Sequence, residues 1–194
     1  MTGNPETDIS QGAKTVDYSR VTMSHMMLPQ DANPVGIVHG GVVMKHIDDA
    51  AGVVALRHTR GNVVTASIDR LDFHNPAFIG NLLSLKASLN LVGTTSMEVG
   101  VRVETEDLKT GQIRHTASAY LTFVALDRRF RPRAVPPLIL ESDEDRRRNR
   151  RALAWRKKPA RPPAGLSRTP AGCQRSNMSK SRSYRTPFQL NLEP

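Results

Sequence analysis

The 194-residue chain has a single cysteine, Cys173, so it cannot close a disulfide within itself or build a zinc site from cysteines alone. No run of about 18 consecutive apolar residues occurs, so no membrane-spanning helix is expected. The first twenty residues also contain no apolar stretch of the kind found in signal peptides. These absences favour a cytoplasmic protein.

Two common catalytic motifs are also missing. No serine stands in a G-x-S-x-G arrangement, and there is no G-x-x-x-x-G-K-[ST] loop, so the sequence matches neither an α/β serine hydrolase nor a P-loop nucleotide-binding protein. The histidines show no spacing typical of metal ligands, and no metal is expected. They are His25, His39, His46, His58, His74 and His115.

Positive charge is concentrated near the C-terminal end. Residues 1–140 carry 14 Lys+Arg and 13 Asp+Glu, whereas residues 141–194 carry 14 and 5. Nearly all of the net charge of +10 therefore belongs to the second segment, and it says little about what the folded part binds.

Composition predicts four parts. Residues 1–18 are polar and unpatterned, and the basic segment 159–194 is rich in Pro, Ser, Arg and Gly, so both are predicted to be disordered. Within 141–158, a candidate N-cap at Ser142 is followed by acidic and then basic residues, which predicts a charged helix. The folded domain is expected over residues 19–140.

Several segments alternate apolar and polar residues with a period of two, which is typical of strands with one buried face. They are Leu83–Leu91, Met97–Val103 and Ala117–Phe123. Val63–Phe73 and the shorter Val21–Leu28 also indicate strands. The breaks between the later strands are short, so neighbouring strands are predicted to be antiparallel.

A long helix is predicted from Gly40 to about His58, where the chain lacks proline and is rich in alanine and valine. It is apolar on most faces, so we expect it to be buried. A single antiparallel sheet of about five strands must then cover one helix. The simplest solution is an α+β fold with the sheet wrapped around a long central helix.

Two neighbouring carboxylates, Asp48 and Asp49, face different directions on this helix. Lys45 stands four residues before Asp49, so an ordinary ion pair accounts for Asp49. Asp48 shares its stripe with apolar or small residues such as Met44 and Ala51, where a carboxylate needs a hydrogen-bonding partner. A catalytic role and a structural role, such as capping an amide or pairing across a subunit interface, explain Asp48 equally well.

The segment Asn33–Gly41 (NPVGIVHGG) leads into the helix. A lone His-Gly-Gly is more often a simple turn into a helix. The chemical alternative is that Gly40 and Gly41 begin the helix, where free N–H groups and the positive end of its dipole stabilise a developing oxyanion.

The spacing Asn33-x-x-Gly36-x-x-x-Gly40-Gly41, followed by Asp48, resembles the hotdog-fold acyl-CoA thioesterases, in particular the group of brain acyl-CoA hydrolase and small bacterial acyl-CoA thioesterases. The similarity covers about residues 18–145, including VVTASIDRLDFHNPAFIG and ASAYLTFVALD. It implies the hotdog fold and hydrolysis of acyl-CoA to free fatty acid and coenzyme A. No cofactor is implied, because coenzyme A is part of the substrate.

The resemblance also assigns roles. Asp48 would be the general base on water or, as an alternative, would attack the thioester and form an anhydride. Asn33 would orient the water or hydrogen-bond the substrate, and the Gly41 N–H would hold the oxyanion, with Gly40 beside it for substrate binding.

A composite site follows from the same resemblance. In two-domain relatives the catalytic asparagine and aspartate lie in different hotdog repeats and meet at their interface. Because this chain carries both in one repeat, a homodimer is implied, with Asn33 from one subunit and Asp48 from the other, and such dimers form a trimer of dimers. Thr94, Thr95 and Ser96 lie where the family binds coenzyme A, although a polar turn between strands explains them nearly as well.

Two other functions remain open. A non-catalytic acyl-CoA-binding or sensing module would share the fold, although the presence of both Asp48 and Asn33 argues against it. The basic tail favours contact with nucleic acid, but neither an aromatic platform nor a recognition helix accompanies it. Only unspecific, salt-sensitive binding is therefore expected.

Overall fold

The computed structural model describes residues 12–157. No helix in this range is long and apolar enough to cross a membrane. In chain order the elements are β1 (Lys14–Thr15), α1 (Val16–Ser19), β2 (Val21–Met26), the 3-10 turn η1 (Pro29–Asp31), α2 (Gly40–Thr59), β3 (Val63–Phe73), β4 (Leu82–Val92), β5 (Ser96–Asp107), β6 (Gln112–Ala125), β7 (Leu138–Ile139) and α3 (Asp143–Arg156).

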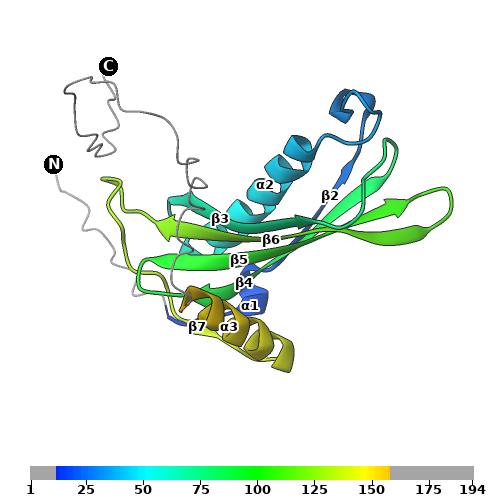
Figure 1. The fold of residues 1–194 in the computed structure, drawn as a ribbon. Helices are drawn as coiled ribbons and strands as arrows, with labels where there is room; N and C mark the ends of the chain where they lie inside the picture. Colours follow the sequence, from blue (N-terminus) through cyan, green and yellow to red (C-terminus); the bar gives the residue numbers. More distant parts are fainter. Residues whose placement is uncertain (1–11, 158–194) are drawn as a thin grey trace, which may run out of the picture. The chain divides into compact units, whose positions relative to one another are not determined.

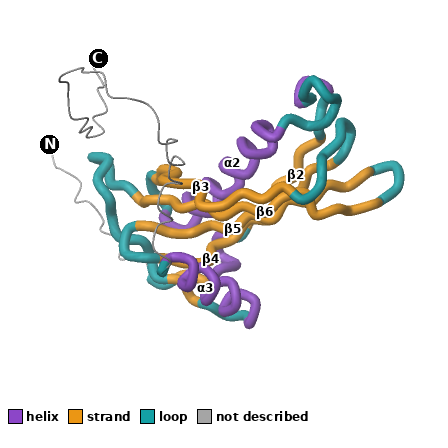
Figure 2. The backbone as a smooth tube through the Cα atoms, viewed as in Figure 1, coloured by secondary structure: helices purple, strands orange, loops and turns teal. Residues whose placement is uncertain are grey.

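The main sheet has five strands in the order β2-β4-β5-β6-β3, and every neighbouring pair is antiparallel. The helix α2 crosses one face of this sheet, and α3 packs on the other (Figures 1 and 2). The prediction of an α+β fold with one antiparallel sheet around a long helix is confirmed.

The core lies between α2 and the three central strands. The apolar members of each alternating strand point to α2, because successive side chains of a strand face opposite sides. The largest fully buried residues here include Ile47, Leu83, Leu85, Leu89, Met97 and Leu121. Burial of each such side chain stabilises the fold by about 1.5–3 kcal/mol.

Only one side of α2 is covered by its own chain. Val43, Ile47 and Val54 are buried, whereas Met44 and Leu56 are exposed. The expectation that the helix is buried on most faces is therefore wrong for a single chain. Its opposite side remains available to another molecule.

The helix α3 explains why two polar side chains of β4 are buried. It begins after Ser142, whose hydroxyl accepts from the Asp145 N–H, as the predicted N-cap requires. Arg148 Nη1 donates to Ser88 Oγ at 2.8 Å, and Asn149 Nδ2 donates to the Asn90 carbonyl at 2.8 Å. The outer face of the second half of β4 is thus covered by α3.

Residues 12–18, predicted to be disordered, are ordered. Lys14–Thr15 pair in parallel with Leu138–Ile139, and Val16 is buried. One buried valine and main-chain pairing hold the segment, and neither is visible in its polar composition. Residues 1–11 and the predicted tail at 159–194 lie outside the described range.

The strand β3 is an edge strand with little cover on either face. It pairs with β6 on one side only, and most of its residues are exposed. Three of them have large apolar side chains: Val64, Ile68 and Phe73 are 45%, 42% and 50% exposed. Unpaired backbone groups and apolar side chains together form a surface suited to pairing with another strand.

Candidate active site

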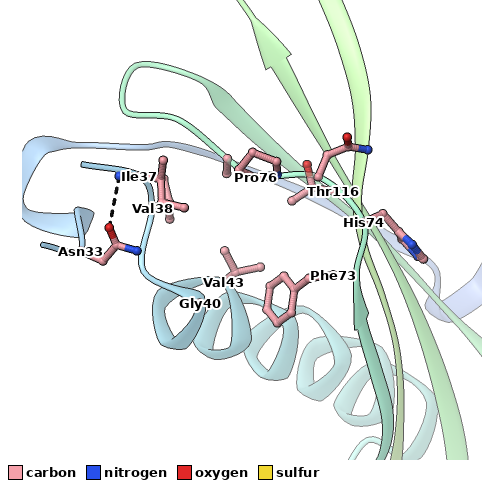
Figure 3. Close-up of a pocket in the computed structure, with 11 residues that line it drawn as sticks. Asn33, Ile37, Val38, Gly40, Val43, Phe73, His74, Pro76 and Thr116 are labelled. Atoms are coloured by element: carbon pink, nitrogen blue, oxygen red, sulfur yellow. Dashed lines mark hydrogen bonds between the residues drawn. The ribbon is translucent and has the colours of Figure 1, made fainter. Parts of the chain in front are cut away.

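The Asn33 side chain shapes the loop that leads into α2. Its Oδ1 accepts hydrogen bonds from the N–H groups of Val35 at 3.0 Å and Ile37 at 3.3 Å, a common way for asparagine to build a turn. Gly36, inside this turn, has a φ of +85°, which favours glycine. Because two backbone donors fix Oδ1, the amide is oriented with Nδ2 toward the adjacent cavity (Figure 3). Asn33 therefore offers a donor to a bound molecule.

At the helix start, His39 is the N-cap. Its Nδ1 accepts from the Gly41 N–H at 2.9 Å. A Cβ on Gly41 would lie only 3.0 Å from this Nδ1, so a larger residue would require the His39 ring to shift. The N–H expected to hold an oxyanion is thus already hydrogen-bonded, and a substrate carbonyl would have to displace His39.

A cavity of about 350 Å³ lies between the Asn33 loop, the start of α2 and the end of β3. Its size is within the usual range for small-molecule sites. The lining is mostly apolar, and in Figure 3 the ring of Phe73 points into it, with Asn33 at the opposite wall and Gly40 nearby. The apolar side chains are Ile37, Val38, Val43, Phe73, Pro76 and Ala77. The cavity suits a hydrocarbon group placed beside an N–H donor.

The two carboxylates of α2 differ as the sequence predicts. Asp49 Oδ2 accepts from Lys45 Nζ at 2.8 Å, so the ordinary ion pair is confirmed. Asp48 is half-buried, and its Oδ1 accepts from Thr65 Oγ1 of β3 at 2.7 Å. The other oxygen, Oδ2, has no hydrogen-bond partner within residues 12–157. One carboxylate oxygen of Asp48 is thus held by a hydrogen bond, and the other is available to a bound molecule.

The predicted site residues do not all meet within one chain. Asn33 and Gly40 line the same cavity, but Asp48 does not. Asp48 lies eight residues after Gly40 on the helix, about 12 Å along its axis.

The turn Thr94–Ser96 lies farther away. It follows the C-terminal end of β4, whereas the N-terminal end of that strand lies near the Asn33 loop. The 11 residues of β4 span roughly 36 Å. The Thr94 carbonyl accepts from the Val135 N–H at 2.9 Å, and Ser96 Oγ accepts from Arg156. Within one chain, these three residues cannot contact a molecule bound in the cavity beside Asn33.

Sequence analysis missed three residues near this site: Thr65, Phe73 and His39. The first two are on β3, where the strand was predicted but no side chain was singled out. His39 directly precedes the Gly-Gly pair, and its place at the predicted helix start was the available signal for an N-cap.

Four of the other histidines form two pairs. His25 and His46 stack with ring centroids 4.0 Å apart, and His74 and His115 lie 4.5 Å apart. Burial, followed by the nearby His25, lowers the pKa of His46 below its ordinary value. In the part of the chain that the structure describes, no three His, Cys, Asp or Glu side chains gather as metal ligands.

The geometry of sheet and helix is that of the hotdog fold. An apo-hexameric acyl-CoA thioesterase matches with a TM-score of 0.73 and 37% identity, over 75% of this chain and 93% of that one. The acyl-CoA hydrolase of Staphylococcus aureus, solved with butyryl coenzyme A and coenzyme A, matches with a TM-score of 0.70 and 34% identity, over 74% and 87%.

Sequence comparison gives the family. The thioesterase superfamily model matches residues 35–112. The uncharacterized acyl-CoA thioester hydrolase YkhA of Bacillus subtilis is 40% identical over 141 residues, covering 73% of this chain and 78% of that protein. The chain therefore belongs to the acyl-CoA thioester hydrolase family of the thioesterase superfamily.

Mammalian relatives are longer. The cytosolic acyl coenzyme A thioester hydrolase of Mus musculus is 37% identical over 136 residues, which cover 69% of this chain but 36% of the mouse protein. The chain thus spans about a third of the length of the mammalian relatives that it matches.

Proposed function

We propose that the protein hydrolyses acyl-CoA thioesters to a free fatty acid and coenzyme A. The observation that carries this proposal is the set Asn33, Asp48 and Thr65. The S. aureus acyl-CoA hydrolase has been solved with one asparagine, one aspartate and one threonine each replaced by alanine, and those positions have the same order and separations along its chain. Here the last two of the set are hydrogen-bonded to each other.

The proposed chemistry uses Asp48 as the base. Thr65 holds Oδ1, so Oδ2 takes a proton from water, and the water oxygen attacks the thioester carbonyl carbon. The oxyanion of the resulting tetrahedral intermediate accepts from Asn33 Nδ2 and from the Gly41 N–H once His39 has moved. Collapse breaks the carbon–sulfur bond, and the departing thiolate takes up the proton that Asp48 received from water, which restores the carboxylate. Direct attack by Asp48, through an anhydride, would use the same geometry.

We propose that the site is completed by a second copy of the chain. Asn33 and Asp48 are separated within one chain, and the Asp48–Thr65 pair lies at the exposed edge strand β3. A two-fold pairing along β3 would cover Val64 and Ile68 and place Asp48 of one subunit by Asn33 of the other. Assembly into a trimer of dimers is supported by the hexameric state of a similar thioesterase.

In this proposal the cavity and the turn Thr94–Ser96 bind different parts of the substrate. The apolar cavity, with Gly40 at its wall, receives the acyl chain beside Asn33. Thr94, Thr95 and Ser96 are too far away to serve that cavity, so in this proposal they contact the coenzyme A bound at a neighbouring subunit's site. Coenzyme A enters with the substrate. A thioester is already activated, so a base and oxyanion donors suffice without a further cofactor.

We further propose a cytoplasmic location, which the cytosolic mammalian relatives support. The division into a hydrolase domain at 19–140, a charged helix within 141–158 and a tail at 159–194 remains part of the same proposal.

A thiol-release assay tests the activity. Purified protein should release free coenzyme A from a series of acyl-CoAs of increasing chain length, and the Asp48→Ala variant should not. If acyl-CoA binds, as measured by calorimetry, but no thiol appears with any chain length, the protein is a binding or sensing module instead.

A further inference from the structure

The turn that follows β6 presents an exposed aromatic side chain in an unfavourable backbone conformation. Phe130 is 70% exposed and has a φ of +58°. Residues with large side chains rarely adopt the left-handed region, and backbone strain of this kind is concentrated at functional positions. In Figure 1 the yellow-green segment after β6 reaches past the ends of the neighbouring strands. The Phe130 side chain in this segment is therefore largely open to solvent.

Hydrogen bonds to one carboxylate hold this turn in shape. Asp127 Oδ1 accepts from the N–H groups of Arg129 at 2.7 Å and Arg131 at 2.9 Å. The Asp127 N–H donates to the Arg131 carbonyl at 2.8 Å, and Arg131 Nε donates to Asp127 Oδ2 at 2.9 Å. A fifth hydrogen bond runs from the Phe130 N–H to the Asp127 carbonyl at 3.1 Å, so the backbone of Phe130 is held in place.

Two basic residues directly precede Phe130 in the chain. The side chains of Arg128 and Arg129 are exposed and have no hydrogen-bond or ion-pair partner within residues 12–157. Arg60, at the end of α2, lies at the same end of the molecule, because Asn62 accepts from the Leu126 N–H. The one carboxylate of the turn, Asp127, is already neutralised by Arg131. The turn therefore presents the aromatic side chain of Phe130 next to positively charged side chains.

We propose that the Asp127–Arg131 turn docks on the surface of an anionic lipid bilayer. Phe130 enters the interfacial layer, where aromatic rings are favoured, and Arg128 and Arg129 contact lipid phosphates. A nucleic acid fits this turn less well, because base stacking uses several aromatic rings along a groove, whereas the Asp127–Arg131 turn offers one ring. One turn binds weakly, so several copies in an oligomer act together.

The turn lies at the end of the sheet opposite to the cavity beside Asn33 of the same subunit. The Asp48–Thr65 pair is nearer to the turn, because Thr65 pairs with Phe123 near the end of β6. The strand β6 is 14 residues long, begins near the cavity and ends just before this turn. Docking through Phe130 therefore keeps the cavity beside Asn33 of the same subunit away from the bilayer. The proposal does not depend on thioesterase activity, and its test measures binding alone.

Vesicle flotation with the full-length protein tests the proposal. Wild-type protein should float with vesicles of phosphatidylcholine and phosphatidylserine, and not with phosphatidylcholine alone. Phe130→Gly relieves the backbone strain, so it should fold at least as stably while the binding constant falls about tenfold, the order expected when an aromatic ring is lost from an apolar environment. The double change Arg128→Gln/Arg129→Gln should lower it further, by roughly fivefold per arginine.

Ile113→Ser is the matched control. Ile113 is 60% exposed near the start of β6, at the other end of that strand, so its loss should leave vesicle binding unchanged. Vesicle binding that is equal for wild type and Phe130→Gly overturns the proposal and assigns any attraction to other basic segments. The proposal is also wrong if Phe130→Gly reduces binding only to single-stranded RNA, or if its main effect in light scattering is a change of subunit number.

Discussion

Thr65 Oγ1 donates a 2.7 Å hydrogen bond to Asp48 Oδ1, which joins the middle of α2 to the exposed edge strand β3. The threonine belongs to a strand with almost no cover in a single chain, and the aspartate belongs to the helix at the centre of the fold. Because Thr65 lies on β3, the pair determines where the Asp48 carboxylate lies relative to a second subunit that pairs along β3. Most of the proposed mechanism can be tested through it.

Replacing Asp48 separates it from its neighbour on the helix. Asp48→Ala should lower kcat on acyl-CoA by on the order of 10²-fold or more, because loss of a general base typically has this effect. Asp49→Ala is the matched control. It removes only the exposed ion pair to Lys45, and such pairs contribute little. Equal losses in two folded variants would show that the assignment of the base to Asp48 is wrong.

Thr65→Val tests whether the hydrogen bond orients the carboxylate. The valine keeps the size of the side chain and removes the hydroxyl, and hydrogen bonds to charged groups contribute about 1.5–3 kcal/mol. We expect kcat to fall at least about tenfold with little change in KM. Ser67→Ala is the control, because the Ser67 hydroxyl bonds Asp69 on the same strand. A kcat equal to that of wild type would mean that Thr65 does not position Asp48.

Phe73 is expected to limit the length of the acyl chain. Its ring points into the cavity, so Phe73→Ala should enlarge the apolar space and shift the optimum of kcat/KM toward longer acyl chains. Phe78→Ala is a suitable control, since Phe78 is also exposed but does not line the cavity. An unchanged chain-length profile, measured by thiol release, would place the acyl chain elsewhere.

Acid should weaken the fold through His58. Its Nε2–H donates to the Pro136 carbonyl at 2.9 Å, and burial lowers the pKa of this fully buried imidazole below its ordinary value. The unfolded chain therefore takes up a proton below about pH 6.5 while the folded chain does not, so stability falls as the pH falls through this range. Urea unfolding at pH 7.5 and 5.5 should show this loss. His58→Gln, which retains a donor but does not titrate, should show a smaller loss, and an equal loss in both proteins would exclude His58 as its source.

The sequence pattern within each segment was sufficient to predict three central strands and the long helix. The alternation in β4, β5 and β6 and the proline-free stretch of α2 each follow from contacts with the single core. The order of Val16 and the burial of Asn90 could not be predicted, because both depend on segments far away in the chain: β7 and α3.

The candidate site could also be predicted only in part from the sequence. The spacing of Asn33, Gly41 and Asp48 identified them through a resemblance. The separation of Asp48 from the cavity beside Asn33 became visible only in three dimensions. The hydrogen bond from Gly41 to His39 depends on loop geometry, which residue types alone do not determine.

The central claim is that each site combines Asn33 of one subunit with Asp48 of another. Complementation tests it most directly. Asn33→Ala and Asp48→Ala should each be nearly inactive, and they are then mixed under conditions in which subunits exchange. With random pairing, half of the dimers are mixed and each has one intact site of two, so about a quarter of the wild-type thiol release should return. If no activity returns although exchange is demonstrated with labelled subunits, each site is built within a single chain, and the composite site is contradicted.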